Sequence, residues 1–232
     1  MRIEELIAPV GDHEIFETDS DALLIKPYMT GDIFVAIPDG DEEIAVAIAA
    51  HPCAIRGANG KLLTRIPCCV LKSTSQPIPY AMWPEGHFDK FPLSDDLGLG
   101  PNQAVRLLEW RAVHHRELTR ARRRAALTER GVYVFQQRLT HALTRVAVKL
   151  DDYERALRDV LREAALEEDW VDGLVADPTD ERAIGKAAEA FHRFLDEEET
   201  PGRKRRELLK VEGGERRLTK LVRDELKAQE SR

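Results

Sequence analysis

Aromatic residues, cysteine and long apolar stretches are all scarce in this sequence. Aromatic side chains make up 6% of the 232 residues, and there are 3 cysteines, two of them adjacent at Cys68 and Cys69. An odd and small number of cysteines argues against a disulfide framework, so we expect free thiols in a reducing compartment. The longest strongly apolar run, residues 44–50, is far shorter than the roughly 20 residues that span a bilayer. No charged-then-apolar segment opens the chain, so we expect a cytoplasmic protein without a membrane partner.

The short motifs that mark common enzyme classes are also missing. The sequence has no Walker loop, no G-x-G-x-x-G, no H-E-x-x-H and no G-x-S-x-G. ATP-binding, dinucleotide-binding, metalloprotease and serine-hydrolase functions therefore lack support. We expect no cofactor, and whether the protein is an enzyme stays open.

Charge is unevenly distributed along the chain. Residues 1–100 hold 7 Lys and Arg against 16 Asp and Glu, whereas residues 101–232 hold 28 against 26. The pattern changes at Gly98-Leu99-Gly100-Pro101 from acidic and strand-like to arginine-rich and helical. We therefore predict an α+β fold, with a small N-terminal β-barrel-like (SH3-like) domain followed by a C-terminal helical domain.

The predicted organisation has four segments. They are an acidic β-rich barrel-like domain at residues 1–75, a proline- and aromatic-rich strap at 76–101, a helical domain at 102–200 and a charged helical tail at 201–232. The strap carries Tyr80, Trp83, Phe88 and Phe91 between its prolines. It either packs between the domains or forms a binding loop.

Within the first domain, residues 22–28, 32–37 and 43–50 predict a meander of strands. Residues 53–56 and 61–72 predict a hairpin, because Asn59-Gly60 between them suits a type I′ turn. In that register Arg56 opposes Leu63 and Cys53 opposes Ile66. The ladder should bulge or end where Pro52 meets Pro67.

The second half predicts a series of helices. Asn102 can cap a helix that runs to about Arg130, with Gly131 as a stop or kink. Apolar residues at helical spacing predict core helices over residues 132–150 and after Asp151-Asp152. Residues 178–181 open a further helix to Leu195, and Gly213-Gly214 precede a last charged helix.

Basic residues concentrate in the predicted helix from Arg106 to Arg130. Four of them fall at i, i+4, i+7 and i+8 and so share one helical face: Arg116, Arg120, Arg123 and Arg124. Such a stripe can follow a phosphate backbone, and a second basic run at residues 203–206 fits the same role. Alternatively the stripe docks against the acidic first domain or meets an acidic protein partner.

Arg56 and Arg65 form a second candidate for anion binding. In the predicted hairpin register the two lie diagonally on one face, where their guanidinium groups can grip a phosphate or a carboxylate. The alternative is that they pair with the carboxylates of the same domain: Asp39, Asp41, Glu42 and Glu43.

His51 and Cys53 are the residues closest to a catalytic role. They share one face of a predicted strand and can be read as a nucleophile pair or, with Cys68, as a zinc site. The paired C-x-x-C spacing of zinc sites is absent, and no orienting acid is identifiable. We therefore assign no catalytic residue and no metal site, and interpret the cysteines as packed thiols.

One stretch resembles a known family. Thr30-Gly31-Asp32-Ile33-Phe34-Val35, an acidic turn and the run at 44–50 resemble the opening of the PemK/MazF-like group of SH3-like barrels, over about residues 28–72. That group includes toxin endoribonucleases, whose second strand typically begins with Arg-Pro, carrying the catalytic arginine, and ends with Ser or Thr. Here Glu43-Ile44-Ala45 and Ala49-Ala50-His51 occupy those places. The resemblance implies a barrel that is catalytically inactive or uses other residues.

The leading hypothesis is a non-enzymatic nucleic-acid-associated or assembly protein that uses the arginine-rich helix as its contact surface. Two alternatives stay open. One is an endoribonuclease-like toxin or defence-type hydrolase acting through the barrel domain with His51 and Arg56 or Arg65. The other is a protein-binding adaptor whose arginines meet an acidic partner. The oligomeric state is not indicated.

Overall fold

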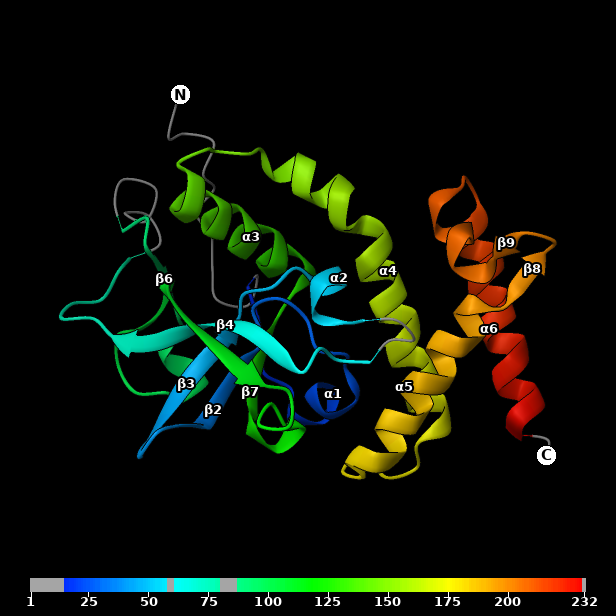
Figure 1. Ribbon diagram of the computed structural model, residues 1–232, viewed down its shortest axis with the longest axis horizontal. Coiled ribbons are helices and arrows are strands. Elements are labelled where there is room, and N and C mark those ends of the chain that lie inside the picture. Colours follow the sequence, from blue (N-terminus) through cyan, green and yellow to red (C-terminus); the bar gives the residue numbers. More distant parts are fainter. Residues whose placement is uncertain (1–14, 58–60, 80–86, 231–232) are drawn as a thin grey trace. The chain divides into compact units, whose positions relative to one another are not determined.

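Figure 1 shows the computed structural model, which describes residues 15–57, 61–79 and 87–230. Contacts within the chain divide it into two units. Unit 1 comprises Met1–Leu23, Tyr28–Ile55 and Leu62–Leu157, and unit 2 comprises Leu24–Pro27, Arg56–Lys61 and Arg158–Arg232. The turn at residues 98–101 lies inside unit 1, where it joins a short 3-10 helix to a long strand.

The described residues of unit 1 form a seven-stranded antiparallel sheet in the order β1-β7-β2-β3-β4-β6-β5. The strands are β1 (Phe16–Glu17), β2 (Ile33–Asp39), β3 (Glu42–Ile48), β4 (Arg65–Ser73), β5 (Lys90–Pro92), β6 (Gln103–His114) and β7 (Arg123–Leu127). Within these residues β1 and β5 each pair with a single strand, so the sheet stays open. The prediction of a mixed fold of helices and antiparallel strands is confirmed, but the SH3-like barrel does not close.

Short apolar runs explain why β2, β3 and β4 pack in the core of unit 1. Phe34, Ile48, Ile66 and Cys68 are fully buried in one core cluster with the neighbouring strands. β2 and β3 match the strands predicted over 32–37 and 43–50 closely, because each apolar run is bounded by turn residues. Asp32 directly precedes β2, and Asp39 is its last residue.

The proline-rich segment contributes to the same unit. Its Phe91 lies in β5 and packs edge-on against Phe16 and Phe135, with ring centroids 6.4 Å and 5.0 Å away. Phe91 is therefore a core residue of unit 1. Tyr80 and Trp83 lie outside the described residues.

The arginine-rich helix predicted for residues 102–130 is wrong. Helix α3 begins only at Glu129, and the residues before it form β6, the 3-10 helix η6 (Arg120–Arg122) and β7. Arg, Leu, Ala and Glu favour helices in isolation, but β6 pairs with β4 from Arg65↔His114 to Ser73↔Gln103, and this pairing outweighs local propensity. The four arginines predicted to share a helical face therefore do not share one.

Three shorter predictions also need correction. Helix α1 (Ser20–Ile25) occupies the start of the strand predicted over 22–28. Helix α2 (Pro52–Ile55) replaces the strand predicted over 53–56, because proline suits the first turn of a helix. Gly57 N donates to Lys61 O and Leu63 N to Ile55 O, one residue away from the predicted register. The predicted turn at Asn59-Gly60 lies outside the described residues.

Helix α3 (Glu129–Thr144) packs against β6 and β7. Thr128 caps it by accepting the Gly131 N–H at 3.0 Å. Gly131 lies in the first turn instead of ending a helix, and a Cβ there would lie 2.3 Å from the carbonyl oxygen of Ile15. The glycine is thus required by close packing.

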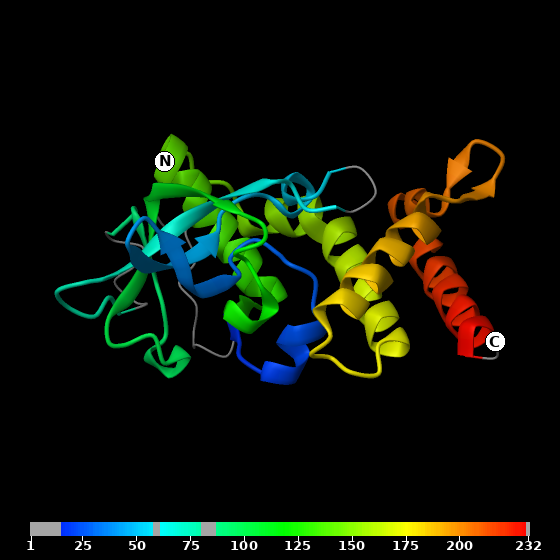
Figure 2. The same ribbon diagram turned by 60° about the horizontal axis from the view of Figure 1, so that its bottom comes forward.

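Unit 2 is mainly helical (Figures 1 and 2). It contains most of α4 (Leu150–Leu174), then α5 (Glu181–Asp196), β8 (Glu198–Thr200), β9 (Arg203–Lys204), the 3-10 helix η7 (Arg205–Lys210) and α6 (Gly214–Glu230). The predicted starts near Asp151, at Asp180-Glu181 and at Gly213-Gly214 are confirmed. Asp180 caps α5 by accepting the N–H groups of Arg182 and Ala183, each at 3.0 Å. Every helix among the described residues is too short or too polar to cross a membrane.

A buried polar cluster joins the helices of unit 2 beside its apolar core. His192 of α5 lies between two glutamates of α4, with Nε2 3.2 Å from Glu167 and Nδ1 3.7 Å from Glu163. Arg206 of η7 pairs with Glu163, and Arg56 lies 3.5 Å from Glu167. His192 and Glu167 are both almost fully buried, so this part of the cluster lies inside unit 2.

Candidate polyanion-binding face

Helix α6 presents a basic face that was not among the predicted sites. Arg216, Lys220, Arg223 and Lys227 follow one another at i, i+4, i+7 and i+11, which places them on one side of a helix. All four are exposed. At the rise of an α-helix the face extends about 16 Å along the axis. We call these four residues the basic face of α6.

The opposite side of α6 is apolar, and it determines which way the basic face points. Leu218 and Val222 are fully buried in the core of unit 2, and Leu221 and Leu226 pack against that core. Burial of this stripe favours the helix and directs the remaining side chains to solvent. The basic face is therefore a consequence of amphipathic packing.

Arg216, Lys220 and Arg223 make no ion pair or side-chain hydrogen bond with any described residue. Together with Lys227 they line an open hollow of about 400 Å³. Two acidic residues share this hollow: Glu215, whose carboxylate already lies 3.4 Å from Arg162, and Asp224. The positive charge of the face thus exceeds the negative charge beside it.

The basic run predicted at residues 203–206 behaves differently, although it belongs to the same unit. Lys204 pairs with Asp196 at 3.4 Å, Arg205 with Glu197 at 2.7 Å, and Arg206 with Glu163. Three of its four cations are therefore neutralised within unit 2.

Arg123, predicted to bind an anion, is instead buried in unit 1. Its guanidinium lies 2.6 Å from Asp32, and both side chains are fully inaccessible. It also donates to the carbonyl oxygen of Leu23 at 3.1 Å and lies 5.4 Å from the ring centroid of Tyr28. Asp32 belongs to the Gly-Asp-Ile motif of the family resemblance, so here that motif supplies a structural ion pair.

The other predicted arginines of this segment differ in their surroundings. Arg120 is half-buried, 5.2 Å from the centroid of the same Tyr28 ring, so the structure brings Arg120 and Arg123 together around one tyrosine. Arg124 donates to the carbonyl oxygen of Leu97. Arg116 is exposed, and its backbone N–H donates to Nδ1 of His114. Of these four arginines, Arg116 is the one that is exposed and has no side-chain partner among the described residues.

Further arginines of the same segment are paired with acidic residues. Arg106 lies 3.2 Å from Asp89, Arg111 lies 2.9 Å from Asp39, and Arg122 lies 2.6 Å from Glu117. Asp39 and Asp89 come from the acidic first hundred residues. Two carboxylates of that part of the chain thus pair with arginines that follow it.

Arg56 and Arg65 belong to different units, and each has its own partner. Arg65 donates to the carbonyl oxygen of Ala112 on β6 at 2.9 Å. Arg56 joins the buried cluster through Glu167. Of the four carboxylates named as alternative partners, Asp39 lies 2.9 Å from Arg111.

His51, Cys53 and Cys68 lie in unlike environments. Nδ1 of His51 accepts the backbone N–H of Cys53 at 3.2 Å, and burial lowers the pKa of His51. Cys53 is exposed, whereas burial, followed by the neighbouring Cys69, raises the pKa of Cys68 to about 12. A thiol with that pKa is a poor nucleophile and a poor metal ligand. Among the described residues, no group of three His, Cys, Asp or Glu side chains could hold a metal ion.

Comparisons with protein-family models, curated proteins and solved structures found no match to this chain. Any function of this chain must therefore be inferred from its own residues. The spacing of the basic face of α6 was visible in the sequence, but the higher density of arginines in residues 106–130 drew the prediction elsewhere.

Proposed function

We propose that this protein is a nucleic-acid-associated protein that holds the phosphate backbone through the basic face of α6, without catalysis. The observation that carries the proposal is the set of exposed cations on one helical face, three of which have no partner among the described residues.

The physical basis is counterion release. A nucleic acid is surrounded by condensed cations, and protein cations that contact its phosphates release them. Cations that already pair within the protein gain less, because they must first give up their carboxylates. The basic face of α6 supports this role better than the paired arginines of unit 1 do.

The test is the salt dependence of binding. Labelled duplex and single-stranded oligonucleotides would be titrated with full-length protein at about 50 mM and about 200 mM salt, with fluorescence anisotropy as the readout. The triple variant Arg216→Ala/Lys220→Ala/Arg223→Ala should bind more weakly at both salt concentrations. For duplex DNA the slope of log K against log salt should become shallower by about 2.7, since each phosphate contact contributes about 0.9.

A matched control removes the same charge elsewhere in unit 2. Arg182, Lys186 and Arg193 are exposed on α5, so the triple alanine variant at these positions lowers the net charge equally. It should keep the wild-type slope. Equal losses for the two triple variants would show that only net charge matters and would contradict a specific face.

If the protein does not bind nucleic acid, the alternative function is an adaptor that binds an acidic protein. Absence of salt-dependent binding to either oligonucleotide, together with co-purification of one stoichiometric acidic protein that the α6 triple variant loses, would replace the nucleic-acid proposal with that function.

A further inference from the structure

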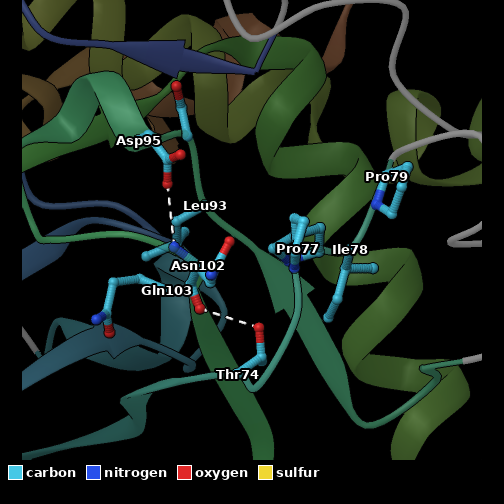
Figure 3. Close-up of a pocket in the computed structure, with 10 residues that line it drawn as sticks. Thr74, Pro77, Ile78, Pro79, Leu93, Asp95, Asn102 and Gln103 are labelled. Atoms are coloured by element: carbon cyan, nitrogen blue, oxygen red, sulfur yellow. Dashed lines mark hydrogen bonds between the residues drawn. The ribbon is translucent and has the colours of Figure 1, made fainter.

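Unit 1 contains a hollow lined by none of the cations discussed above (Figure 3). Its volume is about 220 Å³, and it is open to solvent on one side. Pro77, Ile78 and Pro79 stand on one side of it, and Asp95, Asn102 and Gln103 on the other (Figure 3). An apolar wall thus faces a polar one.

The polar wall is held in place by backbone hydrogen bonds. Oδ1 of Asp95 accepts the N–H of Asn102 at 3.1 Å, and the carbonyl oxygen of Asn102 accepts the N–H and the hydroxyl of Thr74 at 2.8 Å and 3.0 Å. Leu93 N donates to the carbonyl oxygen of Gln103 at 2.9 Å. The backbone that carries the side chains facing the hollow is therefore held in place. Less conformational entropy is then lost when a ligand binds.

Hydrogen-bonding capacity remains on this wall. The side-chain amide of Asn102 makes no hydrogen bond with any described residue. The carboxylate of Asp95 pairs with no cation of the described chain, and its second oxygen has no hydrogen-bond donor there. The amide nitrogen of Gln103 donates to Ser73 at 2.8 Å, which leaves its oxygen as an acceptor. The wall offers more acceptors than donors.

We propose that this hollow binds a nucleobase that carries an exocyclic amino group, such as adenine or cytosine. A cavity of about 150 Å³ holds a benzene ring, so the volume here suits a substituted heterocycle. A carboxylate accepts from an amino group, and an asparagine amide both donates to and accepts from the edge of such a base. The unpaired carboxylate repels phosphate, so the sugar and phosphate remain outside.

The same ring can come from two sources. It is presented by a free nucleoside or by an unstacked base of a single strand, which is how single-stranded nucleic acids are usually read. Binding of a base within a single strand rests on the proposed function, whereas binding of a free nucleoside is independent of it.

The test titrates full-length protein with adenosine, cytidine and uridine, followed by NMR of the backbone amides. The first two should move the signals around Asp95 and Asn102 and bind more tightly than uridine, which has no amino group, by about tenfold or more. A parallel arm compares adenine and thymine homopolymers of about ten nucleotides.

Two variants isolate the contacts. Asn102 has a φ of 55°, a conformation that glycine adopts easily, so Asn102→Gly removes the amide while suiting the backbone. Asp95→Asn keeps an acceptor for the Asn102 N–H and removes the charge. Each should lower the affinity for the amino-bearing ring about tenfold or more. The control is Asp96→Asn, which changes a neighbouring exposed carboxylate that does not line the hollow.

The outcomes separate the two proposals. The hollow is supported if the protein prefers adenosine and cytidine to uridine, or prefers the adenine homopolymer to the thymine homopolymer, and if Asn102→Gly abolishes that preference. A preference among free nucleosides identifies the nucleoside as a ligand, and a preference among homopolymers alone identifies the single strand. Equal binding of adenosine and uridine combined with equal binding of the two homopolymers overturns it, as does a wild-type response from Asn102→Gly. The α6 triple variant should keep the nucleoside response, so failure of the α6 face would be seen only in the salt slope.

Discussion

Basic residues are concentrated both in residues 106–124 and on α6, but most of the first group have partners within unit 1, whereas Arg216, Lys220 and Arg223 of α6 have none among the described residues. In unit 1 the partners Asp32, Asp39 and Asp89 lie at 2.6 Å, 2.9 Å and 3.2 Å from arginine nitrogens. On α6 an apolar stripe holds the helix and leaves the basic face toward solvent. The difference teaches that the number of basic residues in a segment says little about free charge; what matters is whether the fold brings carboxylates to them.

The largest effect should come from breaking the buried pair of unit 1. Arg123→Ala leaves Asp32 as a buried carboxylate without its guanidinium, which should lower the free energy of unfolding by about 3–5 kcal/mol. Urea denaturation followed by circular dichroism measures this. Nucleic-acid affinity per folded molecule should stay unchanged, because Arg123 is inaccessible.

A compensated variant separates the charge from the fold. Arg123→Met combined with Asp32→Asn removes both charges and keeps an acceptor for the N–H of Met29, which Asp32 accepts at 2.8 Å. It should recover much of the lost stability. If Arg123→Ala proved as stable as wild type and bound nucleic acid more weakly, the division between internal and free cations would be wrong.

The next effect contrasts helix packing in the two units. Gly131→Ala in α3 places a methyl group against the carbonyl of Ile15 and should destabilise the protein by about 1–3 kcal/mol. Gly185→Ala in α5 meets nothing within 4 Å and should stabilise it by about 0.5–1 kcal/mol through helix propensity. Thermal unfolding of both variants checks the opposite signs. A stabilising Gly131→Ala would show that α3 packs less closely against unit 1.

Sequence patterns predicted elements whose signals are local. The capping residue Asp180 marked the start of α5, and turns on both sides marked β2 and β3. Strand β6 was not predicted, because its formation depends on pairing with β4, some 40 residues earlier in the chain. Its amino-acid composition by itself favours a helix. Helix α2 was predicted as a strand, because a short apolar run is compatible with either a helix or a strand.

Prediction of the sites was limited in the same way, because local spacing is visible in the sequence and contacts between distant residues are not. The pairing of Arg123 with Asp32 joins residues 91 positions apart, and no spacing rule reports it. The basic face of α6 obeys a helical spacing and could have been found. The hollow beside Asn102 depends on three separate segments, which come together only after the sheet has formed.

The smallest expected effect is a difference in salt slope between alanine variants of two neighbouring residues on α6. Arg216 has no partner among the described residues, whereas Arg217 pairs with Glu199. Arg216→Ala should make the salt slope for duplex DNA shallower by about 0.9, the contribution of one phosphate contact. Arg217→Ala removes the same charge one position along the helix and should change the slope much less, because that cation is already neutralised. Anisotropy titrations at several salt concentrations resolve the two slopes. Equal changes would mean that the surface pair with Glu199 yields readily to phosphate, and the basic face would then extend around α6 to include Arg217.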